Sequence, residues 1–195
     1  LIENLAAHSA PPLAGLAGSL LKRWFHARNR DNIGADLRAM LGAYARVYGL
    51  DPVAAERVFL VPDILHYLFG SIIPHMSPKP MCSGFFACGE ATKDGKLLIG
   101  RNFDFFGRGI WNVNNAIIVM HPEGGQRLCW IGTLGVSGSA QGFNESGLVL
   151  SLHTKFTRDV QSRGIPLFRL THEILAECKT LDEGVARITA QPRIC

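Results

Sequence analysis

The sequence predicts an α+β protein in which helices precede and follow an antiparallel sheet. Three observations support this class. Residues 1–80 place apolar side chains at the three-and-four spacing of amphipathic helices. Residues 83–152 change to the short apolar runs of strands and contain three hairpin-like turns. Two helical patterns then close the chain. Helices that cover one face of a sheet built from hairpins define the α+β class.

Four helices are expected before the sheet. The first begins after Pro11-Pro12, the second ends at Gly49, and the third opens at Asp51-Pro52, where a capping residue precedes a proline. The expected ranges are 13–21, 33–48, a short helix from residue 51, and 61–69. Residues 73–80 contain three prolines, which predicts an extended connector.

Three consecutive hairpins follow, and together they are expected to form about one sheet. Their strand pairs are 83–91 with 96–105, 116–121 with 127–133, and 141–143 with 148–152. The first pair flanks Lys93-Asp94-Gly95, a strong hairpin signal. Helices over 166–178 and 180–190 end the chain. The second of these carries a capping box formed by Thr180 and Glu183.

Composition excludes several classes of protein. With 47% hydrophobic and 18% charged residues, the chain of 195 residues can bury a sizeable core. The net charge of +4 is scattered, so no nucleic-acid partner is expected. Five cysteines without a C-x-x-C pair predict neither a disulfide framework nor a zinc site, and no metal or cofactor is expected. No apolar run reaches the ~20 residues of a transmembrane segment.

Cys82, Arg101 and Asp104 are the candidate catalytic residues. The order of the first hairpin brings this thiol, guanidinium and carboxylate onto two adjacent strands. A cation beside a thiol favours the thiolate, which is the nucleophilic form, and an acid can orient its partners. The simpler interpretation is that Cys82 is a small buried hydrophobe at the start of a strand.

A series of short motifs resembles the N-terminal-nucleophile (Ntn) hydrolases of the cysteine type. The motifs are Cys82-Ser83-Gly84-Phe85, Ala91-Thr92-Lys93-Asp94-Gly95-Lys96-Leu97, Gly100-Arg101-Asn102-Phe103-Asp104, Gly142-Phe143-Asn144-Glu145-Ser146-Gly147-Leu148 and Ser162-Arg163-Gly164-Ile165-Pro166. They are most similar to the isopenicillin N acyltransferase family (acyl-coenzyme A:6-aminopenicillanic acid acyltransferase, C45 peptidase-like) and more distantly to the bile-salt (choloylglycine) hydrolases. The likeness covers about residues 82–193.

This resemblance implies part of an αββα sandwich. Residues 1–81 would be a helical leader or pro-segment, and residues 82–195 the first part of the catalytic domain. A second chain or a downstream segment is expected to complete the fold. The resemblance also implies that the chain cuts itself between Met81 and Cys82. The α-amine freed by that cut titrates near pH 8, so it can serve as the general base for the thiol.

The resemblance implies a role for each candidate residue. Cys82 would attack the carbonyl of a small-molecule amide or thioester and pass the acyl group to water or an amine. Arg101 would lie against the thiolate and the substrate carbonyl, and Asp104 would hold the α-ammonium group. Relatives often use an asparagine to bind the oxyanion. The corresponding position here falls on His153 or Thr154, with Asn144 as a further candidate for substrate binding.

Two alternatives stay open from the sequence. The chain could be a non-catalytic binding or assembly subunit that keeps the Ntn fold, or an uncleaved zymogen. The compartment is also open, with the periplasm or secretion favoured over the cytoplasm because relatives are frequently exported.

Overall fold

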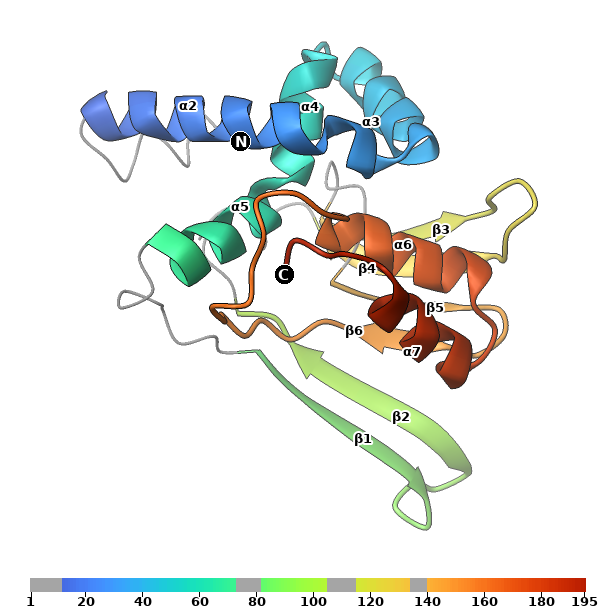
Figure 1. Cartoon of the computed structure of the whole chain (residues 1–195). Coiled ribbons are helices and arrows are strands. Elements are labelled where there is room, and N and C mark those ends of the chain that lie inside the picture. The colour runs from blue at the N-terminus through green and yellow to red at the C-terminus, as the bar shows by residue number, and fades with distance from the viewer. Residues whose placement is uncertain (1–11, 73–81, 105–114, 134–139) are drawn as a thin grey trace.

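The structure is a computed structural model that describes residues 12–72, 82–104, 115–133 and 140–195 (Figure 1). Its helical elements are α2 (Pro12–Asn29), the 3-10 helix η1 (Arg30–Ile33), α3 (Ala35–Val47), α4 (Pro52–Phe59), α5 (Val61–Tyr67), the π-helical turn η2 (Leu68–Ile72), α6 (Leu167–Glu177) and α7 (Leu181–Ala190). Its strands are β1 (Ser83–Gly89), β2 (Gly95–Asn102), β3 (Asn115–Met120), β4 (Leu128–Thr133), β5 (Gln141–Asn144) and β6 (Val149–Ser151). The α+β class is confirmed.

The predicted helix boundaries agree with the structure where a capping residue marks them. The Asp51 side chain accepts a hydrogen bond from the backbone N–H of Val53 at 3.1 Å and opens α4. Thr180 and Glu183 form the predicted capping box of α7. The second helix begins two residues later than predicted, because Gly34 adopts φ +89° and separates η1 from α3. The predicted connector over 73–80 lies outside the described residues.

The three hairpins do not form a single sheet. Strands β3 to β6 form an antiparallel sheet in sequence order, whereas β1 and β2 pair only with each other among the described residues. Figure 1 shows this two-stranded ribbon extending away from the four-stranded sheet. The expectation of one sheet was therefore wrong in this part of the chain. Local alternation and turns set which strands form hairpins, but contacts between distant segments set how hairpins join.

Among the described residues, the four-stranded sheet is covered on one face only. Leu128 and Trp130 point to the face on which α6 packs, and they share a buried cluster with Leu175 of that helix. On the face away from α6, the register of β3 and β4 places Ile117 beside Ile131. That second face exposes five apolar side chains in the described structure: Ile117, Val119, Ile131, Phe143 and Val149.

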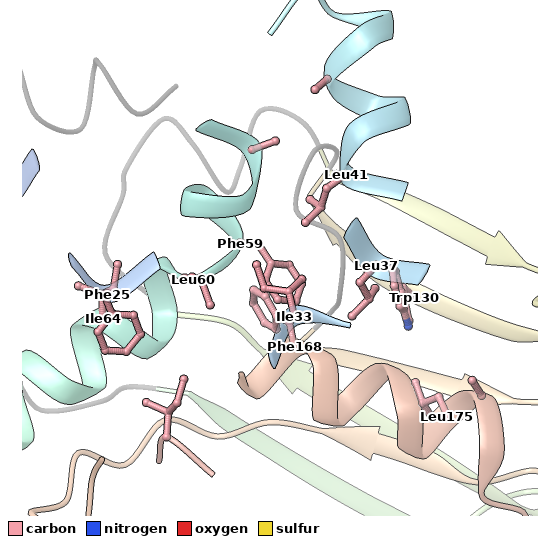
Figure 2. Packing of buried hydrophobic residues seen from close by; sticks show 14 of the residues in the cluster. Phe25, Ile33, Leu37, Leu41, Phe59, Leu60, Ile64, Trp130, Phe168 and Leu175 are labelled. Carbon is pink, nitrogen blue, oxygen red and sulfur yellow. The ribbon is translucent and has the colours of Figure 1, made fainter. Parts of the chain in front are cut away.

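The N-terminal helices share one hydrophobic core with the sheet layer. Figure 2 shows Phe59 of α4 against Phe168 of α6, with ring centroids 6.0 Å apart. The same cluster joins the two parts of the chain through Phe25, Ile33, Leu37, Leu41, Leu60 and Ile64 on one side and Leu128, Trp130, Leu175 and Ile194 on the other. None of the described helices is both long enough and apolar enough to span a membrane.

Glu56 holds three of these helices together. Its buried carboxylate lies 2.6 Å from His26 Nε2 of α2 and accepts a hydrogen bond from Arg38 Nε of α3 at 3.0 Å. Burial alone would raise the pKa of Glu56, but the hydrogen bonds from His26 and Arg38 outweigh it and hold this pKa below its ordinary value.

Two buried polar side chains tie the helices to the rest of the chain. Asn29 donates from Nδ2 to the carbonyl oxygen of Ser162 at 3.0 Å and accepts from the N–H of Gly164 at 3.1 Å. Asp63 of α5 accepts from the N–H of Leu167, the first residue of α6, at 2.9 Å. Asp63 Oδ2 has no hydrogen-bond partner among the described residues. Complete burial raises the pKa of Asp63 to about 7.

Protonation of Asp63 should make the stability of the protein depend on pH. Because the pKa of about 7 in the folded state exceeds the ordinary value of 3.8, the folded chain binds more protons than the unfolded chain between these values. The contribution of protonated Asp63 to the unfolding free energy is therefore fully present below about pH 4 and is lost as the pH rises through about 7. Urea unfolding of the wild type and of Asp63→Asn at several pH values should show the wild type losing on the order of 4 kcal/mol of unfolding free energy relative to the variant between about pH 4 and pH 7.

The matched control is Asp159→Asn, which removes an exposed carboxylate. Its difference from the wild type should stay constant over the same range of pH. If the unfolding free energies of the wild type and Asp63→Asn change in parallel with pH, the raised pKa of Asp63 is contradicted.

Candidate active site

The β1–β2 ribbon brings Cys82 and Arg101 together. Gly84 pairs with Arg101 and Ser83 with Asn102, so Cys82 lies immediately before the first paired residue. Side chains alternate along a strand, and opposite residues share a face, so Cys82, Gly84 and Arg101 lie on one face of the ribbon. Arg101 Nη2 lies 3.7 Å from Cys82 Sγ and donates to it.

The guanidinium of Arg101 also connects the ribbon to the larger sheet. Its Nη2 donates to the carbonyl oxygen of Leu152, directly after β6, and its carbon Cζ lies 4.9 Å from the centre of the Phe103 ring. Partial burial lowers the pKa of Arg101, while the charge of Cys82 raises it. An arginine stays protonated under all these influences, so a permanent cation lies beside the thiol.

The main chain of Asp104 lies beside the thiol of Cys82. The thiol of Cys82 donates to the carbonyl oxygen of Asp104 at 3.8 Å, and the Asp104 carboxylate accepts from Asn102 Nδ2 at 2.8 Å. Sequence reasoning missed this role of Asn102. The signal was present in the Arg-Asn-Phe-Asp motif, because residues two apart on an extended chain point the same way.

His153 lies against Gly84 of the ribbon, two residues along the chain from Cys82. A Cβ atom added at Gly84 would lie 3.3 Å from His153 Cε1 and Nε2 and 3.2 Å from the carbonyl oxygen of Gly100. A glycine at position 84 therefore lets the imidazole lie directly against the strand backbone. Thr154 follows in the irregular segment after β6 and is half-buried.

The structure does not bring Asn144 to this group. Its buried Nδ2 donates to the carbonyl oxygens of Leu175 at 3.0 Å and Cys178 at 2.7 Å, and its Oδ1 accepts from the N–H of Leu148 at 3.0 Å. Asn144 lies four residues after Ala140, whose carbonyl oxygen accepts a hydrogen bond from the N–H of Leu152. Roughly 13 Å of extended chain therefore separates Asn144 from Leu152. In this structure the Asn144 amide holds the end of α6, and its expected role in substrate binding stays a prediction.

A cleft of about 390 Å³ opens on the ribbon beside this cluster. The ring of Phe85 lies across Gly100 on the neighbouring strand, where any side chain would collide with it. The described residues that line the cleft are Ser83, Gly84, Phe85, Gly100, Arg101 and Asn102. Its volume falls in the range of small-molecule sites. Within the described ranges, no group of three or more His, Cys, Asp or Glu side chains is placed to hold a metal ion. Met81, on the expected cleavage site, lies outside those ranges.

Comparison with known proteins gives one match. The model of a family described as acyl-coenzyme A:6-aminopenicillanic acid acyl-transferase matches residues 91–195, just over half of the chain. The matched residues include Arg101, Asp104 and His153, whereas Cys82 precedes them. No curated protein and no solved structure matches the chain.

Arg101 should increase the reactivity of Cys82. In Arg101→Gln, alkylation of Cys82 by iodoacetamide near neutral pH should slow about five-fold, because a unit charge ~4 Å away contributes about 1 kcal/mol even in water. Peptide mass spectrometry after a short pulse of reagent measures the rate. Exposed Cys88 in the same ribbon serves as the internal control.

Arg101→Lys keeps the charge and should lose less of the reactivity than Arg101→Gln does. An unchanged ratio of Cys82 to Cys88 labelling in Arg101→Gln would show that the guanidinium does not act on the sulfur.

Proposed function

Because the chain belongs to the acyl-coenzyme A:6-aminopenicillanic acid acyl-transferase family, we propose that it is a cysteine-dependent Ntn-type amidohydrolase or acyltransferase. The substrate is a small-molecule amide or thioester. The observation that carries the proposal is the 3.7 Å contact between Arg101 Nη2 and Cys82 Sγ at the edge of a cleft. A cation at that distance favours the nucleophilic thiolate.

Activation is the first step of the proposed chemistry. Cys82 Sγ attacks the carbonyl carbon of Met81, the C–N bond to Cys82 breaks, and the departing amine takes up a proton. Water then hydrolyses the resulting thioester. The products are a carboxylate at Met81 and a free α-amine and thiol at Cys82.

The free α-amine then acts as the base in turnover. It takes the thiol proton as Cys82 Sγ adds to the substrate carbonyl, and it returns that proton to the leaving amine or thiol when the C–N or C–S bond breaks. Asp104 holds the ammonium form, and its carboxylate is oriented by Asn102 at 2.8 Å. Arg101 and His153, or Thr154 beside it, stabilise the oxyanion. Water or an amine removes the acyl group from sulfur.

An αββα sandwich is part of the same proposal. Two apolar surfaces support it. The face of the four-stranded sheet away from α6 leaves Ile117 72% and Val119 64% exposed. The ribbon also exposes Phe86 and Leu98, which lie on its opposite faces, by 67% and 56%. Strands that are apolar on both faces are typical of a sheet covered on both sides. We propose that a further polypeptide segment supplies this cover.

Self-cleavage is the direct test of the nucleophile. Intact mass and N-terminal sequencing should find two pieces in the wild type, one of them beginning at Cys82, and a single uncut chain in Cys82→Ala. The pieces should elute together in gel filtration, because Phe25, Phe59 and Ile64 share a core with Trp130 and Phe168. Cys88→Ala is the control and should be cut like the wild type.

An uncut wild-type chain would exclude the processed enzyme. The protein would then be a zymogen that needs an external trigger, or a binding subunit.

The acyl-enzyme is the second test. Incubation of the cleaved protein with an activated aryl ester should add the mass of one acyl group to the fragment that begins at Cys82. The adduct should be absent from Cys82→Ala and should decay faster when a primary amine is added, if the enzyme is a transferase. Acylation of Cys82→Ala at an equal rate would contradict the assignment of Cys82.

A further inference from the structure

Helix α2 carries an apolar stripe that the described structure leaves largely exposed, although the ring of Trp24 at its end also packs against Tyr67 of α5, with ring centroids 5.9 Å apart. Leu16, Leu20 and Trp24 are 60%, 55% and 42% exposed. They are spaced four residues apart, so they lie one above another along one side of the helix. The other side is buried, through Phe25 and Asn29. In Figure 1 the N-terminal half of α2 extends past α4, and the C-terminal half contributes Phe25 to the core.

Positive charge borders this stripe on both sides. Helix α2 contains Lys22, Arg23 and Arg28 and no acidic residue. At 100° per residue, Arg23 falls on one side of the line through Leu16 and Leu20, and Arg28 falls on the other. Both arginines are exposed, and the Arg28 guanidinium lies 5.3 Å from the centre of the Trp24 ring. None of the three cations forms an ion pair with a described residue.

From this arrangement we propose that α2 docks the protein onto a membrane surface that contains anionic phospholipid. The stripe enters the boundary between headgroups and acyl chains, and the arginines reach outward to the phosphates. A tryptophan at the edge of the stripe suits that boundary, because its apolar ring can contact acyl chains while its N–H faces water or headgroups. At 18 residues, the helix has a length of roughly 27 Å along which to make these contacts.

A second copy of α2 is a poorer occupant of the stripe. Pairing two such stripes would bring Arg23 and Arg28 of one copy against those of the other, and the helix offers no acidic residue to balance them. Anionic headgroups bring the opposite charge. The inference is independent of the chemistry at Cys82, so its test measures binding rather than activity.

Flotation with lipid vesicles tests the proposal. The protein should float with vesicles of phosphatidylcholine and phosphatidylserine, and much less with phosphatidylcholine alone. Added salt should reverse the binding. Arg23→Gln with Arg28→Gln should weaken binding about 25-fold, since each basic residue near an anionic surface contributes about five-fold, or about 1 kcal/mol. Leu16→Ser with Leu20→Ser should reduce binding to both kinds of vesicle.

The matched control is Val47→Ser, which removes a side chain that is 79% exposed at the end of α3. It should bind like the wild type. Circular dichroism of every variant checks that the helices remain folded. Equal flotation with both kinds of vesicle, or no loss in the Leu16 and Leu20 variant, overturns the proposal. If that variant instead turns an oligomer into a monomer, the stripe is a contact between proteins.

Discussion

A buried helix needs partners for the backbone groups at both of its ends, and in this protein distant side chains supply them for α6. The Asp63 carboxylate accepts the N–H of Leu167 at the start of the helix, where the helix dipole also favours a negative charge. At the other end, Gln126 and Asn144 donate to the carbonyl oxygen of Cys178. These bonds fix α6 between the N-terminal helices and the sheet, so the packing on either side depends on them.

The position of α6 determines the geometry of the candidate active site around Cys82. Asn144 links the end of α6 to the turn before β6, and β6 leads directly to Leu152 and His153. The carbonyl oxygen of Leu152 holds Arg101, and Arg101 reaches Cys82. Among the described elements, the ribbon of β1 and β2 is thus positioned against the body of the protein by contacts at Arg101 and Gly84. A disturbance at the far end of α6 can therefore be expected to reach the thiol through the strand between them.

The sequence contained enough to place the helices and hairpins and to bring Cys82 and Arg101 together, because these features depend on spacing, caps and turns over short distances. Two other features depend on contacts that no local pattern encodes. The ribbon stays apart from the four-stranded sheet, and Asn144 binds carbonyl oxygens at the end of α6 that lie more than thirty residues further along the chain. A polar residue in a turn suits either a substrate or a helix end, and only the packing of α6 decides between them. Strand periodicity does predict that Asn102 and Asp104 lie on one side of the chain, so the hydrogen bond between them is a feature that a local pattern encodes.

The long spans of chain between α6 and its partners also affect synthesis on the ribosome. Asp63 and Leu167 are 104 residues apart. At roughly 5 to 20 residues per second, the N-terminal helices emerge about 5 to 20 s before the helix they pack against has been made. During that interval the apolar side chains of Phe59 and Ile64 have none of their partners from α6 or the sheet. Nascent chains of this protein would thus spend seconds in a state that binds chaperones, and the rate of translation would influence the yield of folded protein.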